Sequence, residues 1–67
     1  MKSTKLYMAQ KGGSDKSMCL VAANSPEEAF GIMVKSEDYL KYIFNVEDFE
    51  EVLLAEYYGE PCLITYM

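Results

Sequence analysis

The segment that most constrains this chain is Ser25-Pro26-Glu27-Glu28, which lies near its middle. Ser is a strong N-cap residue, Pro suits the first position of a helix, and a Glu at the third position can bond back toward the cap. Glu28 occupies that third position. We therefore expect a helix that begins at Pro26, and the other elements have to be arranged around it.

The length of this helix follows from the spacing of its apolar residues. When successive residues are placed at intervals of about 100°, the apolar side chains from Ala29 to Phe44 gather on one face and most charged ones on the other. One amphipathic helix over residues 26–44 explains this pattern. Ser36 interrupts the apolar face, so a kink or a short break there is the alternative. Asn45 suits the left-handed residue that ends many helices.

Apolar segments on both sides of the helix have the length and composition of strands. They are residues 6–10 and 18–23, with Gly12-Gly13 in the turn between them, and residues 49–58 and 62–67, with Gly59-Glu60 in a two-residue turn. The expected fold class is α+β: two antiparallel β-hairpins form one sheet in the order ββαββ, with the helix packed on one face. Residues 1–67 form a single domain, because a chain this short has room for one core.

The second turn fixes a register for the second hairpin. It places Tyr57 opposite Cys62 on the core face, and it leaves Val52, Leu54 and Leu63 on the opposite face. One helix covers only one face of a sheet. We therefore expect the second face to bind another protein or to be buried against a second copy of the chain. The first hairpin is about equally apolar on both sides, so its pattern leaves open which face the helix covers.

Charge is unevenly distributed along the chain, whose net charge is −5. Residues 1–24 carry four Lys and one Asp, a net charge of +3, whereas residues 25–67 carry ten acids and two Lys, a net charge of −8. The densest acidic segment is Glu47-Asp48-Phe49-Glu50-Glu51. It has three interpretations: a solvated strand start that protects a sheet edge, a contact for a basic protein surface, or a divalent-cation site. The Asp/Asn and Gly pattern of an EF-hand loop is missing, which argues against calcium.

The chain lacks most of the side chains that enzymes use for chemistry. It has no His and no Trp, and its six basic residues are all Lys. Without His, neither Cys19 nor Cys62 has the usual activating base, and the commonest metal ligand is missing as well. We therefore expect no enzymatic activity, no cofactor and no metal. Four carboxylates in five residues repel nucleic-acid backbones, so we also expect no direct binding of DNA or RNA.

The composition also favours one compartment. No apolar segment approaches the roughly 20 residues of a membrane span, and the first five residues lead into a strand rather than into the apolar core of a signal peptide. Two cysteines are too few for a secreted disulfide framework, and both lie in apolar strand patterns. We expect a cytoplasmic protein with reduced cysteines and no contact with a membrane.

Three further residues are candidates for a binding surface, namely Val34, Tyr42 and Tyr58, because the expected core has no obvious place for them. Tyr is also enriched in protein interfaces. Core packing accounts for Tyr39, Tyr57 and Tyr66.

In size, acidity and lack of catalytic residues the chain resembles the small inhibitors encoded by phages and other mobile elements, among them anti-CRISPR proteins and DNA mimics. This resemblance is one of profile, carried by no aligned motif. It implies a protein-binding module that inhibits its target by occupying a basic surface through the carboxylates around Phe49. The alternative is a homodimeric structural or accessory protein that buries its outer sheet face against its own copy.

Overall fold

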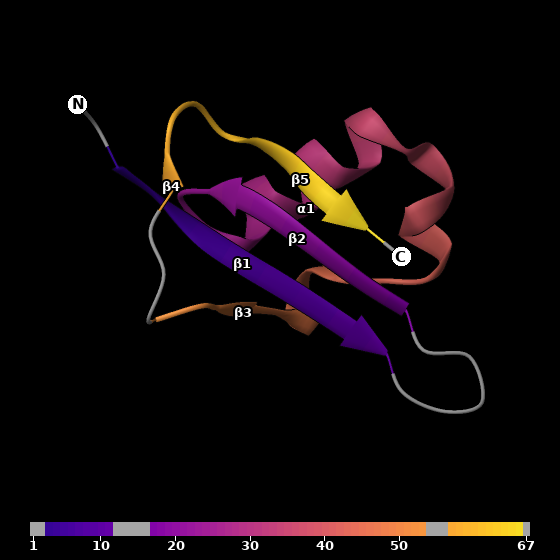
Figure 1. Ribbon diagram of the computed structural model, residues 1–67. Helices are drawn as coiled ribbons and strands as arrows, with labels where there is room; N and C mark the ends of the chain where they lie inside the picture. The colour runs from indigo at the N-terminus through magenta and orange to yellow at the C-terminus, as the bar shows by residue number, and fades with distance from the viewer. Residues whose placement is uncertain (1–2, 12–16, 54–56, 67) are drawn as a thin grey trace.

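A five-stranded antiparallel sheet carries one α-helix and two short 3-10 helices in the computed structural model, which describes residues 3–11, 17–53 and 57–66 (Figure 1). The elements in chain order are β1 (Ser3–Lys11), β2 (Ser17–Ala23), α1 (Pro26–Ser36), η1 (Asp38–Tyr42), η2 (Val46–Asp48), β3 (Phe49–Glu51), β4 (Tyr57–Tyr58) and β5 (Cys62–Tyr66). The expected α+β class, with a helix packed on an antiparallel sheet, is confirmed. Within the described ranges no helix is both long and apolar enough to cross a membrane.

The helix begins where the capping sequence predicts. The Ser25 hydroxyl accepts a hydrogen bond from the Glu28 backbone N–H at 3.1 Å, and the Glu28 carboxylate accepts one from the Asn24 N–H at 2.8 Å. These bonds satisfy donors at the helix start that have no partner within the helix. The predicted start at Pro26 is therefore confirmed.

The helix ends at Ser36, so the expected continuous helix to Phe44 is wrong and the alternative of a break at Ser36 is confirmed. Glu37 adopts an extended conformation (φ −141°, ψ 92°), and the chain then turns into η1. The break redirects the chain, and Leu40 and Phe44 are thereby buried in the same core as Met33. Asn45 is also extended (φ −117°, ψ 166°) rather than left-handed, and it caps η2 instead of ending a helix.

The sheet pairs its strands differently from the second predicted hairpin. β1 and β2 form the first hairpin as expected, but β5 lies beside β2, β3 pairs with the opposite edge of β1, and β4 pairs with Ser3 and Thr4 at the start of β1. The expected strand over residues 49–58 is not continuous, since β3 ends at Glu51. Acidic β3 and η2 lie beside basic β1, and ion pairs join Glu51 to Lys5 at 3.8 Å and Asp48 to Lys11 at 3.4 Å.

The core lies between α1, η1 and one face of the β1–β2 hairpin. Tyr7 pairs with Val21 and Ala9 pairs with Cys19, so these odd-numbered residues share one face of the hairpin. They cluster with buried residues of α1, which shows that this face meets the helix. The buried hydrophobic cluster comprises Tyr7, Ala9, Cys19, Val21, Ala23, Ala29, Met33, Leu40, Phe44 and Phe49. The helix therefore covers the odd-numbered face, which settles the ambiguity of the strand pattern.

We predict that Met33→Ala lowers the free energy of unfolding by about 2 to 5 kcal/mol, because Met33 is fully buried and its truncation leaves a cavity. Tyr42→Ala is the matched control, since this side chain is 81% exposed and its loss should change stability by less than about 0.5 kcal/mol. Urea denaturation followed by circular dichroism measures both values. Equal effects of the two substitutions would contradict the assigned core.

Candidate protein-binding face

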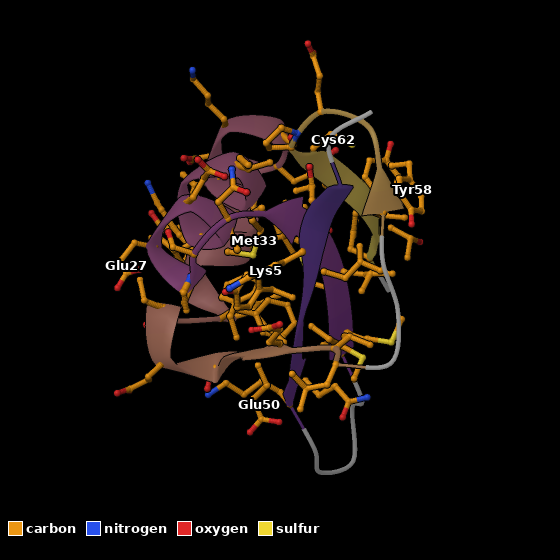
Figure 2. The ribbon with its side chains drawn as sticks, turned by 90° about the vertical axis from the view of Figure 1, so that its left-hand side faces the viewer. Lys5, Glu27, Met33, Glu50, Tyr58 and Cys62 are labelled. Atoms are coloured by element: carbon orange, nitrogen blue, oxygen red, sulfur yellow. The ribbon has the colours of Figure 1, made fainter. Side chains whose placement is uncertain are left out.

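The even-numbered residues of the β1–β2 hairpin form a second face, on the side of the sheet away from α1. Met8 pairs with Leu20, Gln10 pairs with Met18, and Leu6 pairs with Ala22. Four apolar residues of this face, which we call the outer face, are partly exposed: Leu6, Met8, Met18 and Leu20. The helices of the described residues all lie on the other side of the sheet (Figure 2).

Carboxylates border one end of the outer face. Glu50 pairs with Met8 across the β1–β3 ladder, so its side chain lies on the same side of the sheet as the methionine. An open pocket of about 260 Å³ lies at this end. It is lined by Met8, Gln10, Glu47, Asp48 and Glu50. An apolar face thus runs into an acidic hollow.

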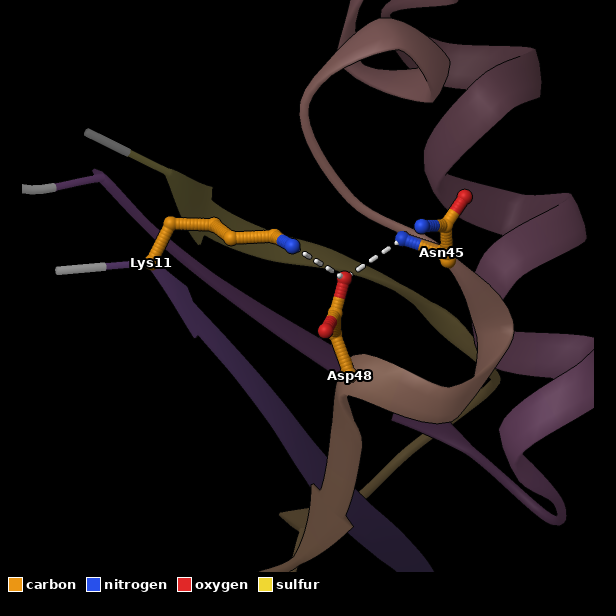
Figure 3. Close-up of polar contacts among 3 residues, drawn as sticks. All are labelled: Lys11, Asn45 and Asp48. Carbon is orange, nitrogen blue, oxygen red and sulfur yellow. Dashed lines mark hydrogen bonds and ion pairs between the residues drawn. The ribbon is translucent and has the colours of Figure 1, made fainter.

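The residues of the acidic cluster have different roles. The Asp48 carboxylate accepts a hydrogen bond from the Asn45 N–H at 2.7 Å, and the same oxygen lies 3.4 Å from the Lys11 ammonium (Figure 3). Asp48 therefore caps η2 and ties this element to β1. Phe49 is 5% exposed and packs in the core, so the structure places it inside rather than on a surface.

Glu47 and Glu50 differ from Asp48 in having no ion pair with a Lys in the described ranges. Both are exposed. Glu51 is exposed as well, but it lies 3.8 Å from Lys5 on the neighbouring strand. Of the four acids in the acidic cluster, Glu47 and Glu50 are therefore the two most available to pair with a Lys or Arg of another protein.

The apolar candidates from the sequence are dispersed. The Val52 N–H donates to the Leu6 carbonyl at 2.8 Å, which places Val52 just beyond β3 at the edge of β1. Leu63 packs against the core cluster instead of lying on the second face. The register of β5 shifts beside Leu20 and Val21, and Leu63 is thereby brought opposite Val21 on the helix side. Leu54 lies outside the described residues.

The three further candidates, Val34, Tyr42 and Tyr58, lie in different environments. Val34 is half-buried against the core cluster, whereas Tyr42 is 81% exposed and Tyr58 is 61% exposed. Figure 2 shows Tyr58 on the side of the molecule opposite Glu27 of α1. The structure therefore does not join Val34, Tyr42 and Tyr58 into one surface with the acidic cluster.

The outer face was not singled out by the sequence, although its signal was present. Leu6, Met8, Met18 and Leu20 alternate along two strands that a tight hairpin aligns, which is the pattern of one sheet face. The opposite face alternates with equally apolar residues, so the two could be told apart only once the helix was placed.

The two thiols lie in different environments. Cys19 is fully buried, and burial raises the pKa of its thiol to about 11. The Cys62 sulfur lies 3.6 Å from the Tyr57 hydroxyl, and this contact raises the pKa of Tyr57. The Cys19 thiol is therefore poorly suited to act as a reactive thiolate. The described ranges also contain no group of three or more His, Cys, Asp or Glu arranged to hold a metal ion.

No protein-family model, curated protein or solved structure matches this chain. No residue of the outer face or of the acidic pocket therefore receives a role from a relative.

We predict that Asp48→Ala lowers the free energy of unfolding by about 1 kcal/mol, because it removes the cap of η2 together with the contact to Lys11. Glu47→Ala and Glu50→Ala are the controls, and each should stay within about 0.5 kcal/mol of the parent chain. Thermal and urea unfolding of the three variants give the comparison. A loss at Glu47 or Glu50 as large as that at Asp48 would show that these acids also stabilise the fold.

Proposed function

We propose that this chain is a non-enzymatic protein-binding module whose outer face and acidic pocket dock on a basic protein surface. The observation that carries the proposal is the juxtaposition of partly exposed apolar side chains with two carboxylates that form no ion pair with a described Lys. Leu6, Met8 and Leu20 supply apolar contact area, and Glu47 and Glu50 border it. An apolar centre with a charged rim is the usual composition of a specific protein interface.

The charge of this region favours a basic partner. The chain carries a net charge of −8 after Asn24, and Glu47 and Glu50 form no ion pair with a described Lys. A Lys or Arg side chain could lay its apolar stem along Met8 and bring its charged head to the pocket acids. Such carboxylates would speed association with a basic surface and disfavour acidic competitors.

A module of this kind acts by occupying a surface. A basic protein surface is often a nucleic-acid-binding one, so occupation by this chain would exclude the nucleic acid. This is the mode of the small phage and mobile-element inhibitors that the chain resembles in profile. The absence of His and Arg from the sequence and the inert setting of Cys19 support binding rather than catalysis. Reduced thiols at Cys19 and Cys62 are in keeping with action in the cytoplasm.

The proposal predicts that Glu47→Lys/Glu50→Lys weakens binding to the partner at least about tenfold, which corresponds to about 1.4 kcal/mol. The partner is first captured from the native host by the tagged parent chain and identified by mass spectrometry, and its affinity is then measured with purified proteins. Asp48 and Phe49 are left intact, because they hold the local structure together.

The matched control is Glu27→Lys/Glu60→Lys, which makes the same change in net charge at two exposed positions away from the pocket. It should bind within about threefold of the parent chain, since long-range electrostatics alone are screened at physiological salt. If both double variants lost the same affinity, the loss would be explained by net charge and not by the pocket. Unchanged binding of the pocket variant would refute the proposed site.

A further inference from the structure

The two edges of the sheet are built differently. The edge that carries β3 has a strand of only three residues, of which Glu50 and Glu51 are charged, with η2 beside it. These are devices by which proteins protect a sheet edge from pairing with another chain. The opposite edge is β5, which ends the strand order and pairs only with β2 within the described ranges. β5 contains no charged residue and no Pro.

Exposed apolar side chains occur in β5 and in η1, which contacts β5 through Tyr39. Among the described residues, six large hydrophobic side chains are exposed, and four of them belong to β5 or η1. They are Ile64 and Tyr66, each 37% exposed, Tyr39, 50% exposed, and Tyr42, 81% exposed. The rings of Tyr39 and Tyr66 meet edge to face with their centres 6.4 Å apart. The expectation that Tyr39 and Tyr66 are core residues is therefore wrong.

Two charged residues of η1 pair with each other. Lys41 lies 3.3 Å from Asp38 in η1. Interaction with the Glu37 carboxylate raises the pKa of the Tyr66 hydroxyl. β5 itself carries no carboxylate, so this edge offers a partner backbone groups and apolar side chains rather than negative charge. Because the acidic pocket offers carboxylates instead, we expect the two sites to bind different partners.

We propose that β5 pairs antiparallel with β5 of a second copy of this chain. Antiparallel pairing of a strand with itself is self-complementary about a two-fold axis, and the absence of charge on β5 means that no like charges are opposed. The acidic β3 lies at the far edge of the sheet from β5, so pairing through β5 keeps the acidic clusters of the two copies apart (Figure 1). A dimer of this kind would join the two sheets and place both outer faces on the same side.

Sedimentation velocity from low to high micromolar concentration tests the proposal. The parent chain should shift from monomer toward dimer as concentration rises. Ile64→Lys should remain monomeric, because two-fold pairing brings the new charges of the two copies close together. Leu53→Lys is the matched control, since Leu53 is 80% exposed and lies outside β5, and this variant should dimerise like the parent chain.

Charge rescue separates pairing from misfolding. Ile64→Lys and Ile64→Glu should each be monomeric alone, and an equimolar mixture should recover the dimer. If either variant fails to fold, hydrogen exchange of the parent chain gives the answer, because the amides of Ile64 to Tyr66 should become more protected as concentration rises. A parent chain that stays monomeric throughout would overturn the proposal. So would a dimer that Met8→Lys dissociates and Ile64→Lys does not, because the outer face would then be the interface.

Discussion

The packing of α1 and η1 against the odd-numbered face of the β1–β2 hairpin is the contact on which the rest of the structure depends. A two-stranded hairpin alone is marginally stable in water. Met33 from α1, Leu40 from η1 and Phe44 just beyond it close over Ala9, Cys19 and Val21, and all six are at most 1% exposed. Because this layer is the only helical layer in the described ranges, it commits one face of the hairpin to the core. The even-numbered face is covered only in part: Ala22 is fully buried there, whereas Met8, Met18 and Leu20 stay partly exposed.

The two edges of the sheet differ in charge. β1 contributes Lys5 and Lys11, and the acidic β3 and η2 lie beside this strand, whereas the uncharged β5 lies beside the apolar β2. Each exposed ion pair contributes little on its own, of the order of 0 to 1 kcal/mol. The sheet as a whole has an acidic edge at β3 and an uncharged edge at β5. The proposed docking pocket belongs to the first, and the proposed dimer contact belongs to the second.

Local signals in the sequence predicted the fold class, the hairpin of β1 and β2 and the helix start, because capping and strand alternation act over a few residues. The pairing of β3 and β5 could not be predicted in this way. A Gly59-Glu60 turn favours a local hairpin, but the competing partners lie some 40 residues away along the chain, where only packing and charge can choose between them. The site shows the same division. The acids were visible as a cluster, yet the capping role of Asp48, the burial of Phe49 and the apolar neighbours at Met8 and Leu20 depend on contacts between distant segments.

The central claim is that helices cover one face of the sheet and that the other face is partly open around Met8, Met18 and Leu20, and the methionines report on both faces. Met33 of α1 is fully buried, whereas Met8 and Met18 are partly exposed on the outer face. The most direct measurement is NMR of 13C-methyl methionine in the presence of a soluble nitroxide, which broadens the signals of accessible methyl groups. The account predicts strong broadening at Met8 and Met18 and little at Met33. If Met8 and Met18 were as protected as Met33, both faces of the sheet would be covered and the account would be contradicted.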